Sequence, residues 1–559
     1  MKHPRTGSSE GVRWIACLFV FAAIHLRADE QRIDGGTYHL GVAGFPEWAE
    51  FRDSKAHGRE LHLEFTAPAR SEAATLLVTQ DNVRHGWSVE LNGHRLGTLE
   101  QAEQKLVSHF RIPPGTLKDG TNRLSVRAPK QVDDIRVGNF RILDGEPSVA
   151  LKACEVNVEV TEILTGNPLP SRLTVIDEDG ALAALVASGV ERHVTNLAAR
   201  AGVIYTIDGR ARIGLRPGAY TIYASRGFEY GVATNRFKLA AGTERAIAMA
   251  IGREVPTPGM VSVDPHIHTR TFSGHGDATV DERMLTIAGE GIELAVATDH
   301  NIHTDYRKPA RAASAQSFFT PVIGNEVTTK HGHFNAFPVA ADAGVPDYKQ
   351  TNWTRLIDGI RAVPGVRVVS LNHPRNVHSG FSPTASEVFD PVTAEGPYTP
   401  QFTMDAMEVL TSAAMQSDIM RPIRDWFALL NYGHRITGLG SSDTHDVNRY
   451  LLGQGRTYVF CKEADASTID VVAVCDSILA GRALISFGLL TEMTVNERFR
   501  VGDLVSVKDG KVQVRVTVSG PSWVTADKLE IFANGLCVGC ASIAATEEIL
   551  KREVEFELG

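Results

Sequence analysis

Histidine and carboxylate side chains are concentrated in the middle of the chain. Eleven of the 20 histidines lie between residues 264 and 445. Most belong to short motifs that follow apolar, strand-like runs: Asp264-Pro-His266-Ile-His268, Asp299-His300-Asn-Ile-His303, Gly324-Asn-Glu326, His331-Gly-His333, Asn372-His373-Pro-Arg375 and Asp443-Thr-His445. Two histidines two residues apart on a strand point to the same side. Burial of so many polar groups at strand ends costs free energy unless each has a partner, and shared metal ions are the simplest partners for all of them.

The mixture of ligand types indicates which ions to expect. Imidazole and carboxylate groups together suit Zn, Mn or Fe. A single histidine at a strand end is more often structural, because its ring can simply hydrogen-bond to a neighbour. Six strand ends that all offer ligands exceed the needs of one ion, so the sequence predicts two or three divalent transition-metal ions.

These motifs lie between about residues 260 and 490, where strand-like and helix-like stretches alternate. The strand-like runs are 260–263, 294–297, 366–370, 407–410 and 436–439, and the helix-like stretches include 280–290, 353–363 and 419–432. Such alternation predicts a parallel sheet with helical crossovers, and about 230 residues suffice for a (β/α) barrel. We therefore expect a central α/β barrel over 260–490 that presents the histidines at one end.

The flanking regions have the alternating pattern of β-strands. The segment Trp87-Ser-Val-Glu-Leu-Asn-Gly93 within residues 30–147 is similar to galactose-binding-like β-sandwiches, and its Asn-Gly pair predicts a hairpin turn. Leu215-Arg-Pro-Gly-Ala-Tyr220 within residues 150–255 resembles small transthyretin-like or carboxypeptidase-regulatory-like domains. Residues 495–559 are expected to form a third β domain. The expected fold is therefore a central barrel, with two β-sandwich domains before it and a β-sandwich tail after it.

The N-terminus and the composition indicate an exported protein. Lys2, Arg5 and Arg13 precede the apolar run 14–24, which is the order of a signal peptide over residues 1–28. An uncleaved N-terminal membrane anchor is the alternative. We expect a periplasmic or extracellular protein with no stable membrane insertion after removal of the signal. The formal net charge of −9 gives no support to a nucleic-acid partner.

Taken in order, H-x-H, T-D-H, G-x-E, G-H, N-H-P and S-D-T-H resemble the PHP (polymerase and histidinol phosphatase) superfamily of metallohydrolases. The T-D-H-N and G-S-S-D-T-H segments are most similar to its carbaryl-hydrolase-like (CehA/McbA) family. The resemblance implies a PHP-type barrel, with Glu326 as a bridging ligand. It leaves open whether the early ligand is His275, our choice, or Asp277, and whether Asp299 is a ligand or orients an imidazole. The implied ligands are His266, His268, His275, His300, Glu326, His333, His373, Asp443 and His445.

The resemblance implies hydrolysis of a small-molecule phosphoester, or of a carboxyl or carbamate ester, by a metal-bound hydroxide. We expect His303 to donate a proton to the leaving group and Arg375 to bind a phosphate or carboxylate of the substrate. One alternative is an amidohydrolase-type C–N hydrolase, which also begins with H-x-H but generally uses a lysine carbamate as its bridge. The other is a non-catalytic secreted protein that binds carbohydrate, with glycan contact through the N-terminal β domains.

Overall fold

The computed structural model describes residues 30–42, 44, 51, 52, 54–188, 197–376, 381–414, 417–462, 465–507 and 510–559. The predicted signal sequence, with the alternative of a membrane anchor, lies outside these residues. Within them, no helix has both the length and the apolar character needed to cross a membrane.

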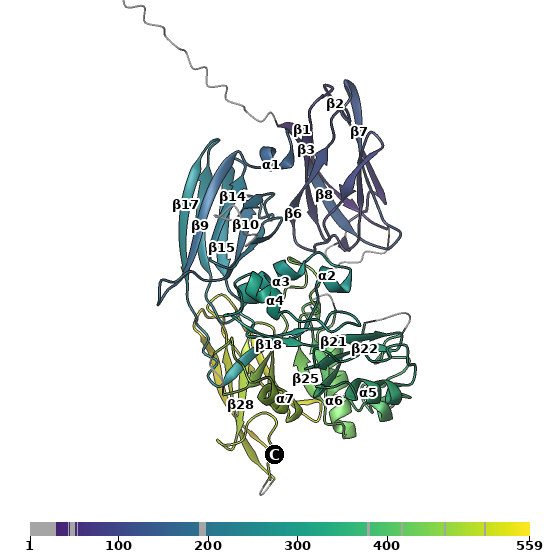
Figure 1. Ribbon diagram of the computed structural model, residues 1–559, viewed down its shortest axis with the longest axis vertical. Helices are drawn as coiled ribbons and strands as arrows, with labels where there is room; N and C mark the ends of the chain where they lie inside the picture. Colours follow the sequence, from purple (N-terminus) through teal and green to yellow (C-terminus); the bar gives the residue numbers. More distant parts are fainter. Residues whose placement is uncertain are drawn as a thin grey trace, which may run out of the picture.

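The first unit contains two four-stranded antiparallel sheets, ordered β1-β8-β3-β6 and β2-β7-β4-β5 (Figure 1). Trp87, Val89 and Phe140 are fully buried in the hydrophobic core of this unit. The predicted Asn92-Gly93 turn is confirmed, because both residues have positive φ between β4 and β5. The strands are β1 (Gln31–Leu40), β2 (Glu60–Ala67), β3 (Ala74–Asp81), β4 (Ser88–Leu91), β5 (His94–Thr98), β6 (Leu106–Ile112), β7 (Gly120–Arg127) and β8 (Ile135–Asp144).

A short helix, α1 (Pro147–Ala150), leads into a second unit of two sheets, ordered β12-β13-β10-β15-β16 and β11-β14-β9-β17. Val156, Leu173 and Ile213 belong to its core. The two units lie next to each other (Figure 1). The strands are β9 (Cys154–Glu162), β10 (Ser171–Asp177), β11 (Val186–Ser188), β12 (Leu197–Arg200), β13 (Val203–Thr206), β14 (Arg210–Leu215), β15 (Gly218–Ser225), β16 (Ala233–Leu239) and β17 (Glu244–Ile251).

The third region carries the histidine motifs on two five-stranded sheets. The first has the order β20-β19-β18-β26-β27 and the second β21-β22-β23-β24-β25. The strands are β18 (Met260–Ile267), β19 (Leu294–Ala297), β20 (Thr320–Ile323), β21 (Asn325–Thr329), β22 (Gly332–Phe337), β23 (Val368–Leu371), β24 (Ala406–Leu410), β25 (Thr437–Gly440), β26 (Arg456–Phe460) and β27 (Ala483–Ser486). The helices are α2 (Arg270–Ser273), α3 (Val280–Gly289), α4 (Arg307–Ala312), α5 (Trp353–Arg361), the 3₁₀ helix η2 (Thr399–Gln401), α6 (Met420–Tyr432) and α7 (Val471–Leu479).

The predicted central (β/α) barrel is wrong. Among the described residues, the ladders form two open sheets, and isolated bridges such as His300 with Glu326 and Ile267 with Thr444 lie between them. A barrel of parallel strands needs a crossover after each strand, whereas strands joined by a tight turn run antiparallel. β21 and β22 are joined by such a turn, and β22 also pairs antiparallel with β23. β26 pairs antiparallel with both of its neighbours.

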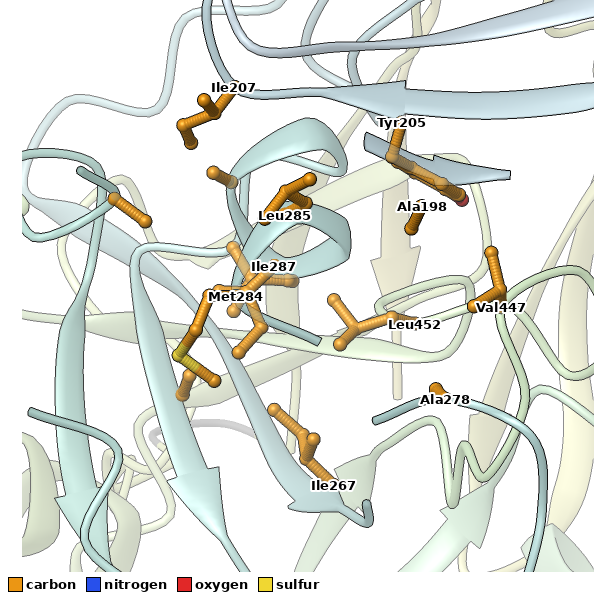
Figure 2. Packing of buried hydrophobic residues seen from close by; sticks show 14 of the residues in the cluster. Ala198, Tyr205, Ile207, Ile267, Ala278, Met284, Leu285, Ile287, Val447 and Leu452 are labelled. Carbon is orange, nitrogen blue, oxygen red and sulfur yellow. The ribbon is translucent and has the colours of Figure 1, made fainter. Parts of the chain in front are cut away.

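Helix α3 joins this region to the second unit. Figure 2 shows Met284, Leu285 and Ile287 of α3 in one buried cluster with Ala198 and Tyr205 of the second unit. Contact at the end of the helix is close, because a Cβ atom on Gly289 would lie 2.6 Å from the Tyr205 ring. The Tyr205 hydroxyl also donates a hydrogen bond of 2.5 Å to Glu290. The two regions therefore share a hydrophobic core.

The C-terminal residues form a further pair of small sheets. One has the order β28-β29-β32 and the other pairs β30 with β31. Val514, Val516 and Val518 point into their shared core, as the alternation of valine with polar residues predicts. The strands are β28 (Leu490–Val495), β29 (Val512–Ser519), β30 (Lys528–Ala533), β31 (Leu536–Ser542) and β32 (Leu550–Leu558).

Candidate metal centre

The two open sheets bring the predicted ligands together. His266 is the penultimate residue of the buried strand β18, His268 directly follows that strand, and His300 follows β19. Glu326 lies on β21 and His333 on β22, the two paired strands of one hairpin. The remaining ligands come just after strands of the second sheet: His373 after β23, and Asp443 and His445 after β25.

Glu326 is the centre of this cluster. Its Oε1 lies 3.1 Å from Nδ1 of His333, 3.1 Å from Nε2 of His373 and 3.2 Å from Nε2 of His266. Its Oε2 lies 2.5 Å from Nδ1 of His300. One carboxylate therefore contacts four imidazoles through its two oxygens.

Asp443 provides the second carboxylate. Its Oδ1 lies 3.4 Å from Nε2 of His266 and 3.4 Å from Nε2 of His268. Nε2 of His445 lies 3.4 Å from Nε2 of His300. The ligand atoms fall into four overlapping groups of three, within which they lie no more than 4.8 Å apart: His268–His300–His445, His266–His373–Asp443, His266–His268–Glu326 and His300–Glu326–His333.

Two buried nitrogen atoms test whether this donor set fits metal ions. Nε2 of His266 and Nε2 of His268 are buried and make no hydrogen bond. An unsatisfied buried polar group costs about 1–3 kcal/mol, so such groups are rare in folded proteins. Both nitrogens lie beside the carboxylate of Asp443. Imidazoles and carboxylates of this kind are ligands of divalent transition metals, and the residues fit such ions.

The protonation states of the histidines differ across the cluster. Burial would lower the pKa of His266, but Glu408, Asp443 and Glu326 raise it well above its ordinary value. Burial and the neighbouring imidazoles of His445 and His266 hold the pKa of His268 well below the ordinary value. Burial, His275 and His300 lower the pKa of His445 to about 2. His268 and His445 are therefore neutral and have lone pairs free for a metal.

Glu408 in β24 belongs to the site although the sequence motifs did not identify it. Its Oε1 lies 2.6 Å from Nδ1 of His266 and accepts a hydrogen bond of 2.6 Å from Ser441 Oγ. Its Oε2 accepts a hydrogen bond of 2.7 Å from the backbone N–H of His373. Burial would raise the pKa of Glu408, but His266 lowers it. A glutamate inside the otherwise apolar run Ala406–Leu410 was the signal available in the sequence.

Asp299 orients a ligand rather than joining the cluster. Its Oδ1 accepts hydrogen bonds from the Thr269 backbone at 2.8 Å and from Ser273 Oγ at 2.8 Å. Ser273 Oγ in turn lies 3.1 Å from Nδ1 of His268. The hydroxyl of Tyr306 donates to the other oxygen of Asp299 at 2.9 Å. The carboxylate therefore holds the His268 ring through Ser273.

The structure places His275, and not Asp277, beside the ligands. The ring of His275 stacks on those of His445 and His300, with centroids 4.4 Å and 5.0 Å away. Asp277 instead forms an ion pair with Arg200, with Nε and Oδ2 2.8 Å apart. His275 thus stays a candidate ligand, and the carboxylate of Asp277 is engaged elsewhere.

The two predicted catalytic residues do not reach the cluster. Nδ1 of His303 lies 3.1 Å from the backbone oxygen of Ala343. Arg375 forms a pair of 2.6 Å hydrogen bonds with the buried Asp425 of α6. Neither side chain lines the main cavity. Both were predicted only from their closeness to motifs in the chain, which does not fix the direction of a side chain.

A cavity of about 1050 Å³ lies over the cluster. Its wall includes the imidazoles of His275, His300, His333, His373 and His445, together with Asp443. Lys330, Tyr348 and Lys349 line it as well. Among the described residues, no carboxylate lies within ion-pair distance of either lysine, so both ammonium groups are free to meet a bound molecule. The cavity has the size of a small-molecule site.

Comparison with known proteins gives no family for this chain. No protein-family model matches it, and no curated protein matches it. Among solved structures, a β-glucuronidase from Ruminococcus gnavus matches with 12% identity over 53% of this chain and 58% of its own, at a TM-score of 0.17. A glycosyl hydrolase family 2 member from Bacteroides cellulosilyticus matches with 10% identity over 95% of this chain and 81% of its own, at a TM-score of 0.19.

The CBM36-1 domain of a multidomain xylanase from the hindgut metagenome of Trinervitermes trinervoides matches with 11% identity over 21% of this chain and 98% of its own, at a TM-score of 0.15. TM-scores this low carry no conclusion about the activity of this chain. The expected membership of the PHP superfamily and of its carbaryl-hydrolase-like family is nevertheless wrong, because no family model matches and the strands form no closed barrel in the described residues. Hydrolysis of a phosphoester, or of a carboxyl or carbamate ester, rested on that membership and falls with it.

Proposed function

We propose that this chain is a metal-dependent hydrolase, with its active site in the cavity above the histidine cluster. The observation that carries the proposal is the set of four overlapping groups of ligand atoms, three of which include Glu326 or Asp443. Two or three divalent transition-metal ions would be held by His266, His268, His300, Glu326, His333, His373, Asp443 and His445, with His275 beside them. Bound there, such ions supply Lewis acidity, which polarises a substrate bond and acidifies coordinated water.

The residues of the chain hold this donor set in place. Glu408 accepts from Nδ1 of His266 and so directs Nε2 toward Glu326 and Asp443. Asp299 acts on His268 in the same way through Ser273. Partners of this kind fix the ring orientation and the tautomer of metal-binding histidines.

The burial of the carboxylates favours metal chemistry over a pair of catalytic carboxyl groups. Hydrolysis of a glycoside by two carboxyl groups requires that both reach the sugar from opposite sides. The side chain of Glu326 is 0% exposed, whereas that of Asp443 is 24% exposed. Only one of the two therefore reaches the cavity, and the buried Glu326 has imidazoles around it.

The free ammonium groups of Lys330 and Lys349 favour a substrate with acidic or strongly polar groups. We take sugars and amides as the substrate classes to test, since both present such groups. The metal-loaded protein is to be assayed against chromogenic glycosides, including glycosides of sugar acids, and against arylamides. Release of the chromophore by the native protein, and its loss in His373→Ala, is the expected result. A loaded protein that hydrolyses none of them would contradict the proposed catalysis.

Metal content tests the site separately from catalysis. Elemental analysis of the native protein, reconstituted and then dialysed, should find at least two ions per chain. His266→Ala and His373→Ala should each lower that number. His62→Ala is the matched control, because His62 lies in β2 and contacts Ser125 and Glu60 of the first unit. A folded native protein that retains no ion would overturn the proposal.

A further inference from the structure

The loop that carries Asp443 and His445 continues to Arg449, where the first β unit holds it. Arg449 makes a bidentate ion pair with Glu103, with Nη2 and Oε1 2.7 Å apart and Nε and Oε2 3.3 Å apart. Glu103 lies between β5 and β6. Both side chains are largely buried, with Arg449 11% exposed and Glu103 21% exposed. Because it is buried and bidentate, such a pair contributes more to stability than an ordinary surface ion pair does.

The second β unit holds the same loop through Arg200, the last residue of β12. Its Nε and Nη2 contact the two carboxylate oxygens of Asp277 at 2.8 Å and 3.0 Å. Its Nη1 contacts Glu282 in the first turn of α3 at 2.9 Å. Oδ1 of Asp277 then accepts a hydrogen bond of 2.8 Å from the backbone N–H of Val447. Arg200 therefore contacts the loop indirectly, through the carboxylate of Asp277.

The segment around Asp277 also contacts His445 itself. The backbone N–H groups of Asp277 and Ala278 donate to the His445 oxygen at 3.3 Å and 3.2 Å. Space between the two segments is minimal, because a Cβ atom on Gly276 would lie 2.4 Å from that oxygen. A third link joins Nη2 of Arg172, in β10, to Oδ1 of Asn448 at 3.2 Å.

We infer that the two N-terminal β units position the His445 loop, and that Arg200 and Glu103 are positioning residues for the metal centre. The inference rests on the proposed function, namely that the cluster binds metal. His445 belongs to the ligand group that it shares with His268 and His300, and its Nε2 lies 3.4 Å from Nε2 of His300. A loop released from Glu103 and Arg200 would leave that group without a fixed third nitrogen, while the ligands on the strands would stay in place.

A charge exchange across the first contact tests this inference. Arg449→Glu places two carboxylates against each other, and Glu103→Arg in the same chain restores an ion pair in the opposite sense. Titration of the metal-free full-length protein with Co²⁺, followed by visible absorption, reports affinity and coordination independently of activity. We expect Arg449→Glu to weaken the binding of one equivalent of Co²⁺ about 10- to 100-fold. The double exchange should recover most of this loss.

The control is Arg515→Glu, which makes the same charge reversal in the exposed Arg515–Glu555 pair of the C-terminal sheets and should bind Co²⁺ like the native protein. If Arg449→Glu does not fold, two milder variants test the inference: Arg200→Lys loses the guanidinium contacts with Asp277 and Glu282, and Asn448→Ala removes the contact with Arg172. Native-like Co²⁺ binding in all the folded loop variants would overturn the inference and leave the metal site intact. Failure of the native protein itself to bind Co²⁺ would instead overturn the proposed function.

Discussion

Glu408 fixes the ring of His266: the carboxylate lies 2.6 Å from Nδ1, so Nε2 faces Glu326 and Asp443. Because a carboxylate oxygen only accepts, Nδ1 carries the proton of this hydrogen bond. The same carboxylate accepts from the backbone of His373. One buried side chain therefore holds two candidate ligands that come from different sheets.

Replacing Glu408 by glutamine should weaken metal binding without unfolding the protein. Glutamine keeps the shape but loses the charge that favours His266 as a ligand, and removal of such partners typically costs 10- to 100-fold in metal affinity, by order of magnitude. Competition with a chelator measures this change. Glu395→Gln is a control in an exposed loop. Equal chelator resistance of native protein and Glu408→Gln would contradict this role.

Replacing Arg375 should affect stability and not the metal site. Its guanidinium pairs with Asp425, whose side chain is 0% exposed, so Arg375→Ala leaves a buried carboxylate without its partner. Such losses cost about 3–5 kcal/mol in the free energy of unfolding. Denaturation by urea measures the change, and metal content should stay at the native value. Arg307→Ala, which removes an exposed pair with Asp305, should change stability by about 0.5 kcal/mol or less.

His275 and His303 should behave differently although both were predicted to belong to the site, His275 as a metal ligand and His303 as a proton donor. The His275 ring stacks on His300 and His445 at the cavity, whereas Nδ1 of His303 faces a backbone oxygen. His275→Ala should therefore weaken binding of one metal ion, and His303→Ala should leave metal content unchanged. Isothermal titration of both metal-free variants with Zn²⁺ compares them. The reverse pattern would show that the stacking of His275 has no part in binding.

The stability of the protein should depend on pH through Glu100, next to the junction of the units. Burial and the nearby Asp277 raise the pKa of Glu100 from 4.5 to about 7, although Arg200 opposes this shift. The unfolded chain loses this proton at lower pH than the folded chain does. The contribution of Glu100 to stability is therefore complete below pH 4.5 and declines as the pH rises to about 7.

Urea denaturation between pH 4 and pH 8 measures this decline for the native protein and for Glu100→Gln. The difference in free energy of unfolding between the two should change between pH 4.5 and about pH 7 and level off above pH 7. Parallel pH profiles would show that Glu100 does not titrate in this way.

The sequence predicted local elements better than their connections. The helix expected over 280–290 is α3, because Thr279 and Glu282 form a capping box at its start. The apolar runs at 294–297 and 407–410 are strands, as expected. Hydrophobic periodicity does not carry strand direction, so the antiparallel β22 and β26 were missed and an open pair of sheets was taken for a barrel.

The candidate ligands could be found from the sequence because eleven of the 20 histidines lie between residues 264 and 445, mostly in motifs that follow strand-like runs. His266 and His333 stood out for this reason, and the structure brings them to the same carboxylate. Glu408 was missed because a single polar residue within an apolar run also occurs in strands at the edge of a sheet, where it has no role in a site. The sequence did not predict that Arg375 turns toward Asp425 of α6, because this contact joins segments 50 residues apart in the chain.

The buried cluster between α3 and the second β unit limits how this protein can be divided. A cut between β17 and β18 would expose Met284, Leu285 and Ile287, which now pack against Ala198 and Tyr205 (Figure 2). An apolar patch of this kind on a free fragment promotes aggregation. The histidine-bearing region is therefore expected to be poorly soluble when expressed alone. The change of strand pattern that divides the two units in the sequence therefore does not mark a place where the protein can be cut into two independent parts.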